Sequence, residues 1–344
     1  MSKKPSRIFP VGKLPASELV GLLRQLRTGD PRLKIGPAVG EDAAVIDMGN
    51  RYLIAKTDPI TLAAERIGWY AVHINANDIA VMGGEPRWFL ATLLLPEGKT
   101  DRRLVQRIAR DLSRTCAELN IVLCGGHTEI TLGLDRPIIV GLMLGEARKR
   151  DLVRKARVRP GDRVLLARGL AIEGTALLAR ERGAELTKAF GQSFVRQAAH
   201  LLMRPGISVV KAATIARRSA DIKAMHDPTE GGLLAALHEL AQVCGVGLRI
   251  DATRIPILNE TQRVCRHFGL DPLGLLASGA LLIIASRADA RRVISGLSRQ
   301  AIDCSDIGET TRPEQGKLLI SGTTRRKIQP PAADEITKAL LQPT

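Results

Sequence analysis

The amino-acid sequence predicts two consecutive domains that each mix helices with short strands, an α/β or α+β fold. The length of 344 residues suits about two domains, and 45% hydrophobic residues are enough for two sizeable cores. Short apolar runs alternate with longer helical patterns in both halves. A basic segment near 146–160 separates the halves. We therefore expect four parts, namely an N-terminal arm and helix over 1–35, a first domain over 36–147, a junction over 148–160 and a second domain over 161–344.

The individual elements follow from the apolar periodicity. Short runs of Val, Ile, Leu and Ala bounded by turn residues predict strands, and longer periodic segments predict helices. In the first half we expect strands at 43–48, 51–57, 88–95, 121–124 and 137–145, with helices near 65–83 and 100–119. In the second half we expect strands near 163–168, 222–226, 246–251, 280–286 and 303–309. Residues 310–334, with Pro330 and Pro331, indicate a loop-rich segment.

The helix expected near 65–83 carries polar side chains on a stripe that should be apolar. Its sequence is ERIGWYAVHINANDIAVMGG, and helical spacing places Asn75 and Asp78 in line with Ala71 and Met82. A buried carboxylate without a partner is costly, because it loses its hydration and gains nothing in return. We therefore expect a cationic group beside Asp78 and a functional role for that side chain.

Three other acidic segments lie at the ends of expected strands. GEDAAVI places Asp42 before a strand, YLIAKTD ends a strand on Asp58, and HDPTEGG places Asp227 in a strand-to-helix turn, where Thr229 is a candidate cap. Carboxylates without clustered Cys or His suit Mg²⁺ bridging substrate phosphates. Taken singly, however, Asp42 or Asp58 is more typical of a turn-capping residue. The four acids together favour magnesium and a nucleotide.

A glycine pair follows the strand expected at 121–124. Cys124-Gly125-Gly126-His127-Thr128 would let backbone N–H groups approach phosphate oxygens closely, although a Gly pair alone usually marks only a turn. The chain has five Cys and no CxxC pair, so neither a zinc framework nor a disulfide scaffold is indicated. Cys116, Cys244 and Cys265 lie in apolar helical patterns. The reactivity of Cys124, beside the glycine pair, is open.

The net charge of +16 raises nucleic-acid binding as a rival function. Residues 1–40 hold eight basic and two acidic side chains, and residues 148–159 hold seven basic and one acidic, which we interpret as a solvated linker. The chain offers no aromatic stacking platform and no recognisable helix-turn-helix, so polyphosphate ligands explain the basicity better. No apolar run approaches the length of a membrane span, and the start has no apolar signal core. We expect a cytoplasmic protein with no membrane partner.

Five ordered segments resemble the signatures of the AIR-synthetase-like ATP-binding superfamily. They are GEDAAVI, KTD, NANDIAVMGG, CGGHTEIT and HDPTEGGLLAALHELA, and the resemblance runs from about Gly36 to about Ile320. Members include AIR synthetase, thiamine-monophosphate kinase, selenophosphate synthetase and HypE. The resemblance implies a homodimer in which two N-terminal sheets form a barrel, with a C-terminal α/β domain closing over ATP.

The second half resembles HypE, a hydrogenase maturation factor. ARVRPGDRVLLARGLAIEGTALL and FGLDPL, followed by a Gly-containing strand, keep the HypE order. HypE proteins end in a Cys that is carbamoylated and dehydrated with ATP, whereas no Cys follows Cys304 here. The spacing from Asn75 to Asp78 is equally similar to thiamine-monophosphate kinase, but His127 stands where kinases have Asp. We interpret the chain as a HypE-like paralogue that lacks the C-terminal Cys.

The resemblance assigns roles residue by residue. Asp42, Asp58, Asp78 and Asp227 would hold Mg²⁺ around the ATP phosphates, and Glu41 departs from the family's Asp. Asp78, Lys56 and His127 are the candidate catalytic residues. The nucleotide would be bound by a larger set that includes two of the metal ligands: Gly40, Asp42, Thr57, Asn75, Gly125, Gly126, Thr128, Asp227, Thr229, Gly231 and Gly232.

The function expected is therefore ATP- and Mg²⁺-dependent phosphoryl transfer, of kinase or dehydratase type, onto an unassigned small acceptor. Thiamine-monophosphate kinase is one alternative. A non-catalytic nucleotide-binding maturation or scaffold protein is another. The partners expected are ATP, an acceptor, a second copy of the chain and a maturation partner protein; nucleic acid is not expected.

Overall fold

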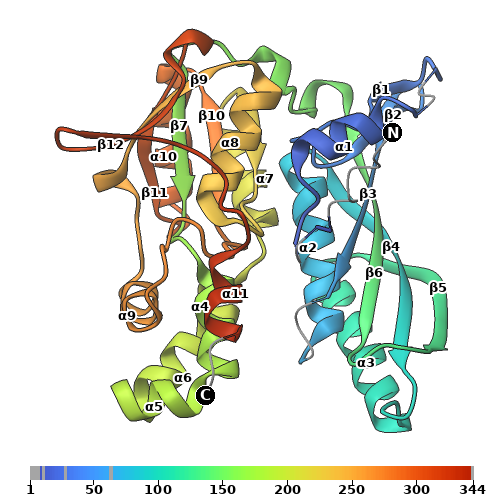
Figure 1. The fold of residues 1–344 in the computed structure, drawn as a ribbon. Coiled ribbons are helices and arrows are strands. Elements are labelled where there is room, and N and C mark those ends of the chain that lie inside the picture. The colour runs from blue at the N-terminus through green and yellow to red at the C-terminus, as the bar shows by residue number, and fades with distance from the viewer. Residues whose placement is uncertain (1–7, 10–11, 27–28, 62–64, 342–344) are drawn as a thin grey trace, which may run out of the picture.

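A computed structural model describes residues 8–9, 12–26, 29–61 and 65–341 and contains two sheets, one in each half of the chain (Figure 1). The expected two-domain mixture of helices and strands is confirmed. Within the described residues, no helix has the length and apolar character needed to cross a membrane. The C-terminal residues 342–344 and the first seven residues lie outside the described part, so the expectations about the tail and the extreme N-terminus are not addressed by it.

The first sheet has six strands in the order β1-β2-β3-β6-β4-β5, and only the pair β4–β5 is parallel. Helices α2 and α3 lie on one side of it (Figure 1). Asp101 starts α3 by accepting a hydrogen bond from the Leu104 N–H at 2.7 Å. The elements of this half are α1 (Ala16–Leu23), β1 (Leu33–Ile35), β2 (Ala44–Asp47), β3 (Arg51–Ile60), α2 (Ile67–Val81), β4 (Glu85–Pro96), α3 (Arg102–Glu118), β5 (Val122–Thr131) and β6 (Ile138–Arg148).

Two predictions for this half were incomplete. The strand expected at 121–124 continues to Thr131, so the glycine segment Cys124–Thr128 is part of strand β5 and not a loop. Strand β1 was not predicted, because three residues carry too little periodicity.

The second sheet has seven strands in the order β13-β12-β9-β11-β7-β10-β8, and only β12–β9 is parallel. Strands β12 and β13 lie in the segment expected to be loop-rich. The loop-rich prediction is therefore wrong for both strands, and β13 carries little strand signal because it is short, charged and exposed. The elements are β7 (Arg163–Ala167), α4 (Ile172–Glu181), α5 (Gly183–Phe190), α6 (Gln192–His200), α7 (Val210–Ser219), β8 (Ile222–His226), α8 (Gly232–Cys244), β9 (Gly247–Asp251), α9 (Asn259–Phe268), β10 (Leu281–Ala285), α10 (Arg287–Ser298), β11 (Cys304–Thr311), β12 (Lys317–Ser321), β13 (Thr324–Lys327) and α11 (Glu335–Leu341).

Helix α2 lies between the two halves, and each of its residues is buried. The first sheet contacts one side of α2, and α7 and β8 of the second half contact another. The stripe that holds Asn75 and Asp78 is therefore one part of a helix without a solvent face. Ala80 and Val81 share an apolar cluster with Val209 and Ala212 of the second half. The two halves are thus docked through a common core.

The basic segment between the halves is folded against both of them. Two short 3-10 turns, Lys149–Asp151 and Lys155–Arg157, interrupt it, and the Val153 N–H donates to the Met82 carbonyl at 3.1 Å. Lys155 is only 3% exposed. The prediction of a solvated linker is therefore wrong for this lysine, whose charge is buried at the site described next.

Candidate active site

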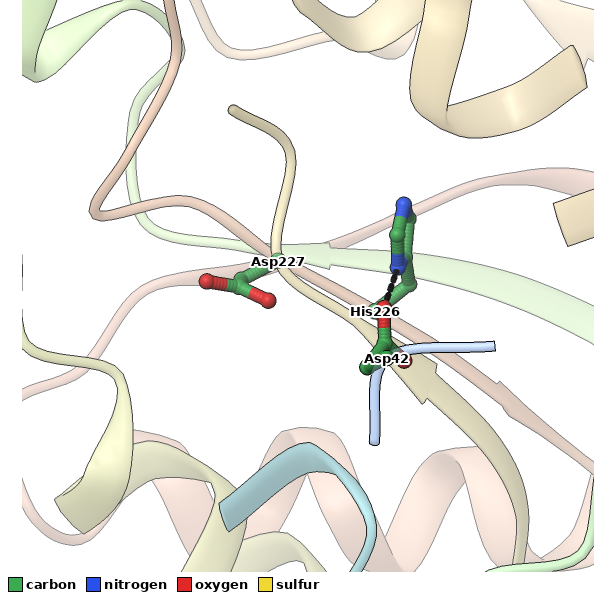
Figure 2. A group of neighbouring side chains, drawn as sticks. All are labelled: Asp42, His226 and Asp227. Atoms are coloured by element: carbon green, nitrogen blue, oxygen red, sulfur yellow. Dashed lines mark hydrogen bonds and ion pairs between the residues drawn. The ribbon is translucent and has the colours of Figure 1, made fainter. Parts of the chain in front are cut away.

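Four predicted metal-binding carboxylates meet where the two halves join. Asp42 precedes β2, Asp58 lies in β3, Asp78 lies in α2, and Asp227 follows β8. Ligand atoms of Asp42, Asp227 and His226 all lie within 4.8 Å of one another (Figure 2). Burial and the charges of Asp227, Asp42 and Asp58 raise the pKa of Asp78, which places all four carboxylates within electrostatic range.

Asp42 is held by two cations. Its Oδ1 lies 2.6 Å from His226 Nδ1 (Figure 2), and its Oδ2 accepts from Lys155 Nζ at 2.8 Å. Burial alone would raise the pKa of Asp42, but Lys155 and His226 outweigh burial and hold that pKa below its usual range. Burial lowers the pKa of His226, but Asp42 and Glu239 outweigh burial and the charge of Lys155 and raise that pKa to about 9. The Asp42–His226 contact is therefore an ion pair at neutral pH.

The cation expected beside Asp78 is Lys56. Its Nζ lies 3.2 Å from Asp78 Oδ2 and 3.7 Å from Asp58 Oδ2. Burial lowers the pKa of Lys56, but the charges of Asp78, Asp58 and Asp42 raise it by more, so the ammonium stays protonated. Burial, together with the charges of Asp227, Asp42 and Asp58, outweighs this contact and raises the pKa of Asp78.

Buried carboxylate oxygens at this site are poorly satisfied by the described part of the chain. Among those residues, Asp227 Oδ2 has no hydrogen-bond partner, and Asp78 Oδ2 has only the ion pair with Lys56 at 3.2 Å. Burial, followed by the charge of Asp42, raises the pKa of Asp227 to about 7. Buried polar atoms are normally satisfied, and hard carboxylate oxygens of this kind are ligands for Mg²⁺. The donor set therefore fits a divalent cation.

Asn75 and Thr57 stabilise the backbone around Asp58. Asn75 Nδ2 donates to the Ala71 carbonyl at 2.9 Å and to the Asp58 carbonyl at 3.3 Å. The Thr57 hydroxyl donates to the Gly141 carbonyl of β6 at 2.8 Å. Both side chains fix β3 relative to its neighbours, and Asn75 keeps one buried oxygen, Oδ1, without a partner.

The turn after β8 is built differently from the prediction. Thr229 does not cap α8 with its side chain; its carbonyl accepts from Gly232 N at 3.0 Å and from Ala277 N at 3.2 Å. Asp334 takes the capping role, since it accepts from Gly231 N at 2.6 Å. The sequence places Asp334 at the start of the last helix, more than 100 residues away, so no local pattern could predict this contact.

Gly40 lies against helix α8. A Cβ at this position would lie 2.8 Å from the Glu239 carbonyl oxygen, and its φ is +86°. Glycine is therefore required here by backbone packing. This packing brings the segment 40–42 next to the turn after β8.

The predicted phosphate-binding residues of β5 lie apart from the carboxylates within one protomer. Gly125, Gly126, His127 and Thr128 are exposed in β5, the edge strand of the first sheet. Asp58 of β3 pairs with Gly141 of β6, which pairs with Ala91 of β4. Ala91 in turn pairs with Gly126 of β5. Three strand spacings separate Gly126 from Asp58, which corresponds to about 14 Å.

His127 and Cys124 contact only their own strand in the contacts described. His127 Nε2 lies 3.3 Å from Glu129 Oε2, and Cys124 Sγ lies 3.5 Å from the Val122 carbonyl oxygen. A Cβ at Gly126 would overlap the Ala91 carbonyl, so the close pairing of β4 and β5 requires this glycine.

Comparison with known proteins identifies the family. The N-terminal domain of AIR synthase related proteins matches residues 40–147, and the C-terminal domain of the same proteins matches residues 159–321. The chain belongs to the AIR synthase related family. This confirms the superfamily predicted from the five ordered segments.

Curated relatives of this family member are named as hydrogenase maturation proteins. It is 27% identical over 344 residues to a hydrogenase expression/formation protein of Methanocaldococcus jannaschii, covering 97% of this chain and 99% of that protein. It is 30% identical over 263 residues to the carbamoyl dehydratase HypE of Rhodobacter capsulatus, covering 74% of each.

Solved structures share the fold. A structure of HypE in complex with ATP has a TM-score of 0.70 and 22% identity, covering 94% of this chain and 97% of that one. HypE in a HypE–HypF complex has a TM-score of 0.71 and 19% identity, covering 91% of this chain and 99% of that one. Thiamine monophosphate kinase of Aquifex aeolicus has a TM-score of 0.63 and 22% identity, covering 83% of this chain and 92% of that one.

Three residues of this family member were missed or undervalued in the sequence. Lys155 was interpreted as part of a solvated linker, His226 beside Asp227 was left open as a site residue, and Asn77 was not considered. Asn77 Nδ2 donates to the Ile207 carbonyl at 2.9 Å, and Asn77 Oδ1 accepts from Val209 N at 2.8 Å. Each of the three has its partner far away in the sequence, so only the folded chain identifies them.

Proposed function

We propose that this chain is an ATP- and Mg²⁺-dependent enzyme of the HypE-like kind, which transfers a phosphoryl group to a small acceptor as part of a kinase or dehydratase reaction. The observation that carries the proposal is the group of buried carboxylates with unsatisfied oxygens where the halves join. The relatives named carbamoyl dehydratase support the dehydratase type. ATP in a HypE structure of the same fold supports the choice of nucleotide.

Asp78 and Asp227 would hold the magnesium ion, with Asp42 and Asp58 completing the site. Within the residues that the structure describes, Asp227 has a buried oxygen without a hydrogen-bond partner, and the buried Asp78 Oδ2 has only its ion pair with Lys56. Asp42 and Asp227 offer ligand atoms within 4.8 Å of each other. When bound, magnesium supplies positive charge that neutralises the phosphate oxygens during transfer. Asp42 already accepts hydrogen bonds at both oxygens, so we expect it to contribute a remaining lone pair or to act from the edge of the site.

The chain's own residues would orient the nucleotide and hold charge. Lys56 stays protonated beside Asp58 and Asp78, so its ammonium provides a fixed positive charge near the phosphates. Asn75 fixes the Asp58 backbone through its 3.3 Å hydrogen bond. Because phosphoryl transfer depends mainly on positioning and charge, these are the contributions that the chemistry requires.

A homodimer would explain the exposed apolar residues of the first sheet. Leu142 alternates with the buried Met143 in β6, so it lies on the face away from α2, and it is 38% exposed. Val122 is 58% and Ile130 is 56% exposed in the edge strand β5. We expect a site to include Gly125, Gly126, His127 and Thr128 only when a second copy covers this face. A maturation partner protein and a cytoplasmic location remain predictions.

The test compares Mg²⁺-dependent ATP binding and hydrolysis of the wild type with Asp227→Asn. We expect turnover to fall at least about 100-fold, because a charged ligand becomes neutral. The fold should be kept, since burial already disfavours the ionised Asp227 and raises its pKa to about 7. Asp221→Asn is the control; this exposed carboxylate at the other end of β8 pairs with Arg157 on the surface.

The outcomes separate the alternatives. Turnover stimulated by thiamine monophosphate would identify the kinase reaction, and ATP binding without turnover would identify a scaffold protein. Full activity in Asp227→Asn, with the same Mg²⁺ dependence as the wild type, would show that the assigned site is wrong.

A further inference from the structure

A buried lysine from the domain junction contacts the Asp42 carboxylate. Lys155 lies in the 3-10 turn Lys155–Arg157, and its Nζ is 2.8 Å from Asp42 Oδ2. His226, at the end of β8 in the second half, reaches the other Asp42 oxygen at 2.6 Å. One carboxylate of the first half is therefore held from two sides, by the junction and by the C-terminal sheet.

The three side chains are almost fully removed from water. Lys155 is 3%, Asp42 is 6% and His226 is 7% exposed. A charge buried to this degree is stable only when it is paired and hydrogen-bonded. Long-range surface attraction does not explain the contact; each of these groups needs the others in order to be charged at this depth.

Each cation is also fixed on its far side. The Lys155 ammonium donates to the Gly40 carbonyl and lies 3.5 Å from Glu41 Oε2. His226 Nε2 lies 3.5 Å from Glu239 Oε2 on α8, and Glu239 Oε1 lies 3.6 Å from Lys13 Nζ. Neither cation can shift toward Asp42 or away from it without breaking other contacts. The direction of the Asp42 carboxylate is therefore set by the junction and by β8, which are both far from Asp42 in the sequence.

We propose that Lys155 and His226 are positioning residues that hold the Asp42 carboxylate in the candidate metal site, so that the site is complete only when both halves and the junction are docked. The consequence for activity rests on the proposed function. The consequence for stability does not, because the buried pairing exists whatever the reaction is. Lys155 thus links the placement of the domains to the geometry of the carboxylates.

The first experiment compares Lys155→Met with Lys155→Arg in the full chain. It measures kcat, the KM for ATP and the Mg²⁺ concentration that gives half-maximal hydrolysis. For Lys155→Met we expect kcat to fall about 10- to 100-fold, as for other misplaced active-site groups, and the Mg²⁺ requirement to rise. The KM for ATP should change less. Lys155→Arg keeps the charge and should recover part of kcat and of the Mg²⁺ response. If Lys155 served only as packing volume, keeping the charge would give no such recovery.

The control is Lys149→Met in the same junction. Lys149 pairs with Asp47 at 3.1 Å, and its side chain is 47% exposed, so this variant should match the wild type in all three quantities. A folded Lys155→Met protein with wild-type kcat and Mg²⁺ response would overturn the proposal.

A melting experiment covers the case in which Lys155→Met does not fold or the wild type has no Mg²⁺-dependent turnover. Lys155→Met removes one of the two cations that hold the buried Asp42 carboxylate, whereas in an Asp42→Asn background that carboxylate is already absent. Lys155→Met should therefore lower the melting temperature by less in the Asp42→Asn background than in the wild type. An equal loss in both backgrounds would refute the pairing. Absent turnover in the wild type would refute the proposed function and leave this comparison to decide the inference.

Discussion

Glu173 is a buried carboxyl group whose ionisation should destabilise the folded chain. It lies in the first turn of α4, it is 7% exposed, and its Oε2 has no hydrogen-bond partner in the part of the chain that the structure describes. Burial raises the pKa of Glu173 from 4.5 to about 7, and the nearby Ser278 hydroxyl lowers that pKa only in part. Between these values the folded chain binds more protons than the unfolded chain. Stability from Glu173 is therefore present at pH 4.5 and lost as the pH rises to about 7.

This dependence of stability on pH gives a prediction for Glu173→Gln. The amide cannot ionise, so the free energy of unfolding at pH 8 should rise by up to roughly 3 kcal/mol over the wild type, with little change near pH 4.5. Urea unfolding of the variant and the wild type at the two pH values measures this difference in the free energy of unfolding. Asp227, whose pKa is about 7, acts in the same pH window, so part of the wild-type slope should persist in the variant. Exposed Glu181 of the same helix supplies the control Glu181→Gln. An unchanged free energy of unfolding at pH 8 would contradict the assignment.

At the same residue scale, local patterns predicted the four carboxylates and Lys56 beside Asp78, but not Lys155, which holds Asp42. Asp42, Asp58, Asp78 and Asp227 are each marked by a strand end, a turn or an apolar helix in their own segment. Lys155 lies 113 positions from Asp42 in the sequence, and its neighbours Arg154 and Arg157 make it look like part of a surface charge run. A contact across such a distance has no periodic signature, so sequence reasoning could find Asp42 and miss the lysine that holds it.

At the scale of elements, helix α2 depends on Asn77 for its attachment to the second half. Asn77 is fully buried and bonds both the Ile207 carbonyl and the Val209 N–H. Asn77→Ala leaves two buried backbone groups unsatisfied, so we expect the free energy of unfolding to fall by roughly 2–5 kcal/mol. Urea unfolding measures this loss, and Gln106→Ala on the exposed face of α3 is the control. A loss no larger than that of the control would mean that water or the relaxed backbone satisfies these groups.

Strand β5 shows how an element can be located correctly and assigned the wrong structure. Its glycines indicated a loop, because Gly usually marks a turn between strands. Here Gly125 and Gly126 have φ values of +148° and +151°, and both continue the extended strand. Gly126 is required because it lies against the Ala91 carbonyl of β4. Close approach between strands requires glycine just as a turn does, so the sequence alone could not distinguish a strand from a turn here.

At the scale of the whole molecule, the two-domain organisation was predictable and the docking of the domains was not. Alternating apolar runs in each half indicate two sheets, and both sheets are present. The common core depends on small residues such as Ala80 in α2 and Ala212 in α7, which pack together although no motif marks them. The candidate site lies where these halves meet, so its full geometry depends on a feature that the sequence pattern does not contain.

The open face of the first sheet gives a prediction for the assembly of the molecule. Leu142 in the centre of β6 pairs with Thr57 of β3 and Leu90 of β4 and is 38% exposed, whereas the next residue of the strand, Met143, is fully buried. If a second copy covers this face, Leu142→Glu places a charge where water is excluded and like charges from the two copies meet. The wild type should then have about twice the 37.2 kDa mass of one chain by light scattering at micromolar concentration, and Leu142→Glu should have the mass of one chain. Met48→Glu, in the exposed turn between β2 and β3, should keep the wild-type mass. A wild type of 37.2 kDa, or a Leu142→Glu variant that keeps the doubled mass, would exclude this face as the dimer interface and would also remove the means by which β5 reaches a site.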